Sequence, residues 1–243
     1  MNRYRLWTAT LTLVLAATLP LSLAQQPAKA PAKEQSVKPG INEQWKSPNV
    51  EPLIGTLEAE SREIYRQRED LAALVGPLPG MVVADVGAGS GFMAEQFARL
   101  VGEKGKVFAV DINAKLLEHI AQRAQQNGLR NIQTVLARED SVELPASSVD
   151  LVFICDTYHH FEYPRSTMAS IHRALRPDGQ LVLVDFRRIP GKSRQFVFDH
   201  VRAGQEEVIR ELTSFGFQLT NLHDVTFLPE NYIARFRKVE TPR

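Results

Sequence analysis

The most distinctive short motif in the chain is a run of glycines that follows an apolar segment. Residues 85–91 read DVGAGSG, with glycines at positions 87, 89 and 91. Glycine lets the backbone turn tightly and lets a ligand approach where any Cβ would collide. Twenty residues after Gly91, Asp111 ends a second apolar run, and a carboxylate there can accept hydrogen bonds from both hydroxyls of a ribose. Together these residues indicate a site for a cofactor that contains a nucleoside.

The spacing of the glycines separates two classes of cofactor. A dinucleotide site requires G-x-G-x-x-G, which would place its third glycine at position 92, where this chain has Phe92. The chain instead has G-x-G-x-G, with Asp85 two positions ahead of the first glycine. A carboxylate there would repel a pyrophosphate but can serve the positive ammonium of a methionine group, directly or through water. The spacing therefore favours a cofactor that carries an amino acid.

A second cluster of reactive side chains lies at residues 155–161, which read CDTYHHF. His159 and His160 have ordinary pKa values near neutrality and could act as bases; alternatively, one of them packs under the loop with a backbone hydrogen bond. Asp156 either contacts the cofactor or caps the loop. A metal site made of Asp156, the two histidines and His200 would lack a ligand spacing that fixes its geometry, so the sequence predicts no metal site.

Alternating strands and helices must position these residues. A helix is expected from about Thr56 to Val75, stopped by Gly76 and Pro77, and the tail 217–239 is expected to be a hairpin because a short turn at 228–230 joins its two strands. Strands alternating with helices indicate a parallel sheet with right-handed crossovers. The expected strands cover 81–86, 107–111, 132–137, 149–155, 180–186, 217–225 and 231–239, and the expected helices cover 92–101, 114–126, 164–175 and 204–215.

In their order and spacing, the motifs resemble those of the class I S-adenosylmethionine-dependent methyltransferases over about residues 57–240. The pair His159-His160 after the fourth strand is most similar to the small-molecule enzymes of the ubiquinone-biosynthesis type. The terminal hairpin is a further feature of the family that a dinucleotide fold lacks. The matching segments are Asp85–Gly91, Asp111, Glu139-Asp140-Ser141, Val149–Phe153 and Leu175–Gly179.

The resemblance implies an α/β fold: a seven-stranded Rossmann-like sheet, mostly parallel, with a C-terminal antiparallel hairpin. It implies methyl transfer to an oxygen, nitrogen or carbon of a small molecule, with His159, His160 and Asp156 as candidate catalytic residues. Residues 187–203 are the expected specificity segment, with Phe198, His200 and Arg202 as candidate wall residues. The implied S-adenosylmethionine contacts are Asp85, Gly87, Ala88, Gly89, Gly91, Asp111, Ile112, Asp140, Ser141, Asp156 and Tyr65.

Two other interpretations stay open at this point. A methyltransferase fold that has lost its activity could serve as a binding module, and a dinucleotide oxidoreductase is a lesser alternative. Nucleic-acid substrates are not expected, because 29 basic and 28 acidic residues leave no basic field. The segment 156–159 also departs from the [D/N]-P-P-[Y/F] motif of many amino-group methyltransferases. The single cysteine, Cys155, excludes an internal disulfide and a thiolate-rich metal site.

The first 40 residues differ in kind from the rest. Residues 1–24 combine Arg3 and Arg5 with an apolar run and a small-residue ending at Ala24, which is the pattern of a secretory signal peptide. Residues 25–40 are rich in Pro, Ala and Lys and are predicted to be a flexible linker, followed by the domain at 41–243. We expect export to the periplasm or the exterior after cleavage near Ala24. An uncleaved segment would be a membrane anchor, and no other membrane contact is expected.

Overall fold

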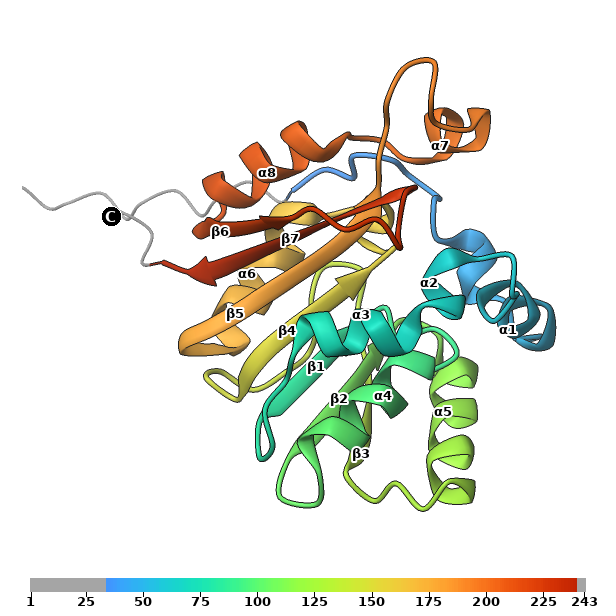
Figure 1. The fold of residues 1–243 in the computed structure, drawn as a ribbon, viewed down its shortest axis with the longest axis vertical. Coiled ribbons are helices and arrows are strands. Elements are labelled where there is room, and N and C mark those ends of the chain that lie inside the picture. The colour runs from blue at the N-terminus through green and yellow to red at the C-terminus, as the bar shows by residue number, and fades with distance from the viewer. Residues whose placement is uncertain (1–33, 240–243) are drawn as a thin grey trace, which may run out of the picture. The chain divides into compact units, whose positions relative to one another are not determined.

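The computed structural model describes residues 34–239, and seven strands of this part form one mixed sheet (Figure 1). The strand order is β3-β2-β1-β4-β5-β7-β6. Neighbours from β3 to β5 pair in parallel, and β7 runs antiparallel to both β5 and β6, so it alone points the opposite way. The strands are β1 (Val82–Val86), β2 (Lys106–Asp111), β3 (Ile132–Leu136), β4 (Val149–Cys155), β5 (Leu175–Phe186), β6 (Phe217–His223) and β7 (Asn231–Lys238).

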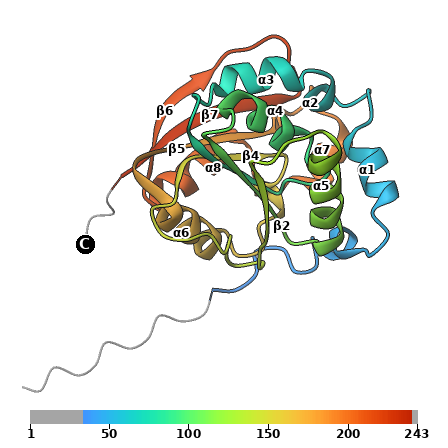
Figure 2. The same cartoon turned by 90° about the horizontal axis from the view of Figure 1, so that it is seen from below.

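Helices cover both faces of the sheet. One face packs against α3 (Arg68–Val75), α4 (Phe92–Val101) and α5 (Ala114–Gln126), and the other against α6 (Pro164–Ala174) and α8 (Gln205–Ser214). Figure 2 separates α3 and α4 at the top from α6 at the lower left. Alternate residues of the central strands are buried on opposite faces, which is why these strands are almost continuously apolar.

The predicted fold class is confirmed, and each predicted strand is present with small shifts at its ends. The largest shift is in β5, which begins at Leu175 and not at residue 180. Val149 pairs with Leu175, whereas Leu151 pairs with Gln180, so a register shift places residues 175–179 at the start of the strand.

The predicted helix at 56–75 is instead three short helices, α1 (Glu51–Leu57), α2 (Glu63–Arg66) and α3. Helix α1 ends at Leu57, and Arg62, which adopts an extended conformation, directly precedes α2. One guanidinium nitrogen of Arg62 donates to the carbonyl of Leu57, and another donates to Asp156. These tertiary contacts offset the loss of helical hydrogen bonds. They cannot be predicted from the helical periodicity of the sequence.

The last part of the predicted linker packs against the domain. Gly40 N donates to Glu162 Oε1 at 3.1 Å, and Lys38 Nζ donates to the carbonyl of His200 at 2.9 Å. The carboxylate of Glu34 accepts from two backbone N–H groups at the start of α6. The compact unit therefore begins at Glu34. The predicted signal peptide lies outside the described residues.

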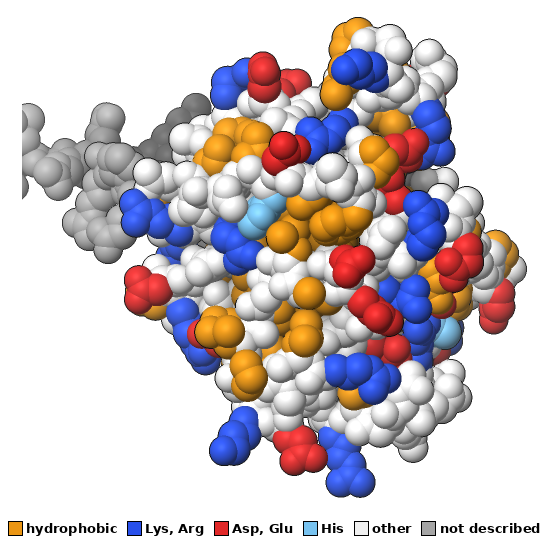
Figure 3. All heavy atoms as spheres, in the orientation of Figure 1, with side chains coloured by type: hydrophobic (Ala, Val, Ile, Leu, Met, Phe, Trp, Pro, Cys, Tyr) orange, Lys and Arg blue, Asp and Glu red, His pale blue; other side chains and the backbone are white. Residues whose placement is uncertain are grey.

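Three short helices without a sequence prediction border the carboxyl ends of the strands: η1 (Glu43–Lys46), η2 (Tyr158–His160) and α7 (Gln195–His200). Within residues 34–239, no helix combines the length and the apolar character needed to cross a bilayer. Figure 3 shows Lys and Arg side chains mixed with Asp and Glu over the face it presents. That face carries no extended basic field of the kind that a nucleic-acid backbone requires.

Candidate active site

A cavity of about 460 Å³ lies at the carboxyl ends of β1, β2 and β4. In this sheet β2 and β4 flank β1, so the chain order reverses at β1, and such a switch point is where open α/β sheets bind ligands. The volume is within the usual range for small-molecule sites. Its wall combines the glycine loop, the loop after β4, the segment that precedes α2, and α7.

The glycine loop forms one wall of the cavity through its backbone. Gly87 has φ +76°, and a Cβ at this position would overlap the side chain of Thr157. Gly89 has φ +56°, and its N–H donates to Asp111 Oδ2 at 2.9 Å. Both positions therefore require glycine, and Asp111 holds the loop in shape. Asp111 Oδ1 accepts a second backbone hydrogen bond, from Asn113 N at 2.9 Å.

Two buried carboxylates give this end of the cavity a negative potential. Burial, together with the nearby charge of Asp111, raises the pKa of Asp85 to about 7. Burial also raises the pKa of Asp111, although backbone N–H groups oppose the shift. Asp85 Oδ2 is buried and has no hydrogen-bond partner among residues 34–239. A free buried carboxylate oxygen beside a glycine loop suits a cofactor that carries both an ammonium and a ribose.

Most of the predicted cofactor contacts line the cavity, and four do not. The residues in the wall are Asp85, Gly87, Ala88, Gly89, Asp111, Ile112 and Asp156. Gly91 lies behind the loop against Ile120. Tyr65 packs edge-on against Phe92, with ring centroids 5.3 Å apart. Asp140 pairs with Arg138 at the surface, and Ser141 bridges backbone-to-backbone with Arg138.

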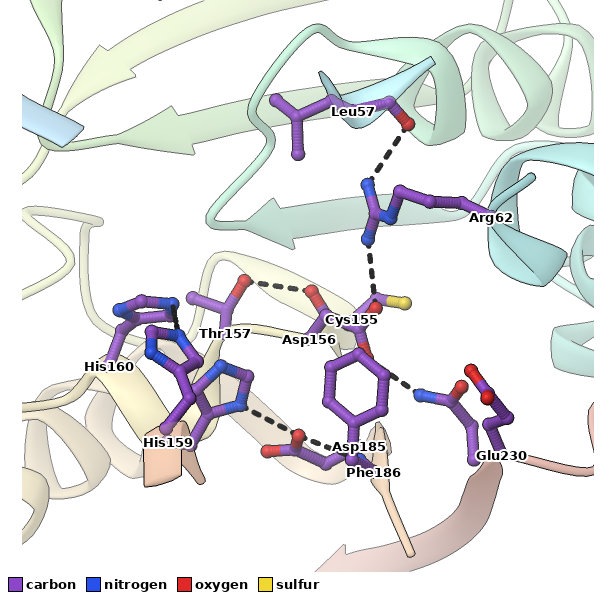
Figure 4. A network of polar contacts seen from close by, with 12 residues as sticks. Leu57, Arg62, Cys155, Asp156, Thr157, His159, His160, Asp185, Phe186 and Glu230 are labelled. Carbon is purple, nitrogen blue, oxygen red and sulfur yellow. Dashed lines mark hydrogen bonds and ion pairs between the residues drawn. The ribbon is translucent and has the colours of Figure 1, made fainter. Parts of the chain in front are cut away.

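Asp156 lies in the wall with both carboxylate oxygens engaged by the protein (Figure 4). Oδ2 accepts from Arg62 at 2.8 Å, and Oδ1 accepts from the Asn231 amide at 2.7 Å. Its φ of +47° is unusual for a residue other than glycine. Burial raises the pKa of Asp156, against the opposing attraction of Arg62. The carboxylate thus ties together the segment before α2, the end of β4 and the start of β7.

The two predicted histidines lie in the cavity wall and have different partners (Figure 4). His159 Nδ1 is 2.7 Å from Asp185 Oδ1, and both side chains are buried. Burial works to lower the pKa of His159, but the charge and hydrogen bond of Asp185 outweigh it, so the pKa is raised. Burial and the neighbouring imidazoles lower the pKa of His160 to about 2. His160 Nε2 is 3.2 Å from Nε2 of His200.

Aromatic rings surround the imidazoles at this end of the cavity. Trp45 meets His160 edge-on at 5.5 Å between ring centroids, and Phe196 stacks on His200 at 5.0 Å. Phe186 also lines the cavity and lies 6.0 Å from the ring of His159. This end therefore presents flat apolar surfaces beside ring nitrogens, an arrangement that suits a flat acceptor.

Of the three predicted wall residues on 187–203, only His200 lines the cavity. Phe198 lies under the guanidinium of Arg188, and Arg202 forms an ion pair with Glu211. The sequence interpretation missed Trp45, Asp185, Phe186 and Phe196. Asp185 and Phe186 end a predicted strand and could have been found by their position, since catalytic and binding groups gather at strand ends. Trp45 and Phe196 follow no motif.

Residues 84–183 match the family described as Methyltransferase domain. The ubiquinone/menaquinone biosynthesis C-methyltransferase UbiE of Shewanella sp. (strain ANA-3) is 29% identical over 125 residues, which is 51% of this chain and 50% of that protein. The chain thus spans about half the length of the curated relatives it matches. A second UbiE, from Shewanella baltica (strain OS155 / ATCC BAA-1091), is 28% identical over the same shares of both chains.

Solved structures share the fold. A SAM-dependent methyltransferase from Aquifex aeolicus superimposes with a TM-score of 0.69 at 24% identity, covering 76% of this chain and 97% of that one. The 1,6-didemethyltoxoflavin-N1-methyltransferase of Burkholderia thailandensis, with bound S-adenosylhomocysteine, gives a TM-score of 0.55 at 22% identity, covering 77% of this chain and 81% of that one.

The comparisons give no support to the dinucleotide oxidoreductase or to a binding module without activity. The order of the strands, the terminal hairpin and the glycine loop agree with the family match. Residues 84–183 therefore match a methyltransferase domain, and the chain has the fold of S-adenosylmethionine-dependent methyltransferases.

Proposed function

We propose that this chain transfers a methyl group from S-adenosylmethionine to a small, flat acceptor, through an oxygen, nitrogen or carbon atom. The observation that carries the proposal is that a single cavity joins the glycine loop and Asp111 to a cluster of imidazoles and aromatic rings. One end suits a nucleoside and an ammonium, and the other suits an aromatic or similarly planar molecule. Direct transfer of a methyl group requires the cofactor and the acceptor to be bound side by side, as they would be in one shared cavity.

The cofactor end is assigned by the chemistry of its side chains. Asp111 would accept hydrogen bonds from the ribose hydroxyls, and the free oxygen of Asp85 would serve the ammonium. Backbone at Gly87 and Gly89 leaves the space that a side chain would fill. Asp140, Ser141 and Tyr65, which lie outside the wall, are the weaker members of the predicted set. When bound, S-adenosylmethionine supplies a methyl group on a positively charged sulfur.

The protein's own part in the reaction is positioning and proton removal. The Asp185 carboxylate, 2.7 Å from Nδ1 of His159, would accept a hydrogen bond from Nδ1–H, and its charge raises the pKa of this imidazole and so makes it a stronger base. The imidazole cluster would then assist the loss of a proton from an acceptor hydroxyl or amine. Trp45 and Phe196 would hold the acceptor plane and keep water away. Asp156, predicted as catalytic, would act by positioning, because its carboxylate joins Arg62 to Asn231 across the cavity wall.

Calorimetry with S-adenosylhomocysteine tests the cofactor part of the proposal. We expect one molecule bound per chain, and no binding at millimolar ligand would overturn the assignment. Methyl uptake from labelled cofactor into metabolite extracts then tests the acceptor class. We expect labelled products from small aromatic compounds, and labelling confined to aliphatic compounds would contradict a flat acceptor.

Two phenylalanines on α7 provide a matched pair for the acceptor end. Phe196 lines the cavity and stacks on His200, whereas Phe198 on the same helix does not line it. Phe196→Ala should reduce turnover of the acceptor without changing the affinity for S-adenosylhomocysteine, and Phe198→Ala should change neither. Equal turnover in both variants would place the acceptor elsewhere.

We also propose that the domain works outside the cytoplasm, from the basic start, apolar run and small-residue ending of residues 1–24. The basic residues precede the apolar run, so the domain would cross the membrane whether or not cleavage occurs. The cofactor would then need a transporter or would be bound before export. Cell fractionation with N-terminal sequencing tests this: a protein beginning at Gln25 in the periplasm is expected, and full-length protein in the cytosol would overturn it.

A further inference from the structure

Three imidazole rings converge at the acceptor end of the cavity. One nitrogen from each of His159, His160 and His200 lies within 4.8 Å of the others. The two Nε2 atoms of His160 and His200 are 3.2 Å apart. Bonds of about 2.0–2.1 Å from Zn²⁺ to nitrogen, at tetrahedral angles, put ligand nitrogens about 3.3 Å apart. One pair is thus at the separation of two ligands on a shared ion, and the third nitrogen would have to approach the others by up to about 1.5 Å.

Asp185 lies behind the cluster and is only 2% exposed. Its Oδ1 is 2.7 Å from Nδ1 of His159, and its Oδ2 is buried without a partner in the described part of the chain. The nearby ammonium of Lys38 donates to the carbonyls of Asp199 and His200. A buried carboxylate is costly unless a positive charge compensates it. A carboxylate bonded to the outer nitrogen of a histidine is also the usual support for a metal ligand.

We propose that His159, His160 and His200 bind one divalent transition-metal ion of the Zn²⁺ type, with Asp185 orienting His159. Three neutral imidazoles suit zinc, cobalt or nickel, whereas calcium and magnesium require oxygen ligands. Three histidine ligands leave one position open, as in catalytic zinc sites. All three rings line the cavity, so the open position faces the space where the acceptor would bind.

The proposal revises the expectation that the chain has no metal site. His200 is 40 residues from His160 in the sequence, and α7 alone brings its ring to the other two. The inference deepens the proposed function in one respect: the open position would bind an oxygen or nitrogen atom of the methyl acceptor. The metal site itself rests on the side-chain geometry and not on methyl transfer.

Metal titration of the untagged full-length chain tests the proposal without the cofactor. After treatment with a chelator, the protein is titrated with Co²⁺, followed by visible absorption, and with Zn²⁺, followed by calorimetry. We expect one ion per chain, the visible bands of a four- or five-coordinate cobalt site, and displacement of Co²⁺ by Zn²⁺. Asp185→Asn should weaken Zn²⁺ binding by about 10- to 100-fold.

Two substitutions of His200 and a matched control complete the experiment. His200→Ala removes one ligand, and His200→Phe does so while keeping a ring to stack on Phe196; each should weaken binding by more than about 100-fold. His223 lies on β6 and does not line the cavity, so His223→Ala should bind as the unaltered chain does. Binding of less than one ion, or unchanged binding in folded His200→Phe, would overturn the proposal.

A parallel measurement separates this inference from the proposed function. The affinity for S-adenosylhomocysteine is measured in the presence of a chelator, so it reports on the cofactor end alone. Metal binding without S-adenosylhomocysteine binding would contradict the proposed function and leave the metal site standing. The reverse result would remove the metal site and leave methyl transfer standing.

Discussion

The cofactor end and the acceptor end of the cavity are built in different ways. Asp85 lies near the end of β1, and Asp111 ends the adjacent parallel strand β2; the glycine loop is shaped by positive φ angles and by the hydrogen bond from Gly89 N to Asp111 Oδ2. The acceptor end takes Trp45 from the N-terminal segment, His160 from the loop after β4 and His200 from α7. The first region is one short stretch of chain on a rigid sheet. The second is assembled from three short helices that meet only in the folded molecule.

This difference indicates which part of the site tolerates few substitutions and which part can accept new side chains. A region fixed by backbone hydrogen bonds and positive φ angles tolerates little variation, because each change strains the chain itself. A region made of side chains on short connecting segments can be rebuilt without disturbing the sheet. The boundary between the two regions is the Arg62–Asp156–Asn231 network, and the largest effect that we predict concerns this network.

Arg62→Ala should destabilise the protein by about 3 kcal/mol, because it leaves the buried carboxylate of Asp156 without its ion-pair partner. Urea unfolding monitored by fluorescence measures this change. The double variant Arg62→Ala with Asp156→Asn should regain part of the loss, since it removes the uncompensated charge.

Arg176→Ala is the matched control for that prediction. Arg176 pairs with Asp150 at 2.6 Å, but this pair is exposed, and its removal should cost less than about 1 kcal/mol. If Arg62→Ala is no more destabilising than Arg176→Ala, the network is not the boundary described above, and the two regions would be joined by packing alone.

Asp111→Ala should weaken binding of S-adenosylhomocysteine by about 1.5–3 kcal/mol, which is a loss of about 10- to 150-fold. The variant loses the expected ribose contacts and the two backbone hydrogen bonds that shape the glycine loop. Asp111→Asn keeps one acceptor oxygen and should lose less. Calorimetry measures both variants, with circular dichroism to show that they fold. An unaltered affinity in Asp111→Ala would move the ribose site away from β2.

The features that could be predicted from the sequence lie mainly in the cofactor end of the cavity, and those that could not lie mainly in the acceptor end. The strands and the glycine loop were predicted because apolar runs and glycine spacing are local properties of the chain. The break between α1 and α2 was missed because a contact that holds it, the ion pair of Arg62 with Asp156, joins residues 94 positions apart in the sequence. The imidazole cluster was predicted in part. His159 and His160 are adjacent in the sequence and were predicted, but the positions of Asp185 and His200 beside them depend on tertiary packing.

Binding of S-adenosylhomocysteine should weaken by about tenfold between pH 8 and pH 6, because Asp85 has a pKa raised to about 7 and must be ionised to attract the ammonium. The folded state holds this proton more tightly than the unfolded state does, so Asp85 lowers stability as pH rises through 7. Asp85→Asn should therefore bind weakly and independently of pH, and unfold at a higher temperature than the unaltered chain at pH 8. Equal affinity of the unaltered chain at both pH values would contradict the assignment.

The smallest predicted effect concerns Asp140, where the resemblance and the structure lead to different expectations. The resemblance implies that Asp140 contacts the adenine. In the structure its carboxylate forms an ion pair with Arg138 at 2.9 Å, which is exposed and worth little. The neighbouring Arg138 and Glu139 line the cavity, and Asp140 does not.

Asp140→Ala should therefore change the affinity for S-adenosylhomocysteine by less than about threefold, equivalent to about 0.6 kcal/mol. Glu139→Ala is the companion variant, because Glu139 lines the cavity and forms an ion pair with Lys46 at 2.7 Å. Calorimetry on both variants compares them directly. A tenfold loss in Asp140→Ala would mean that the loop after β3 turns when the cofactor binds. The cofactor end would then depend on a side chain of a connecting loop, as the acceptor end depends on side chains of short connecting segments, and the contrast between the two regions would be weaker.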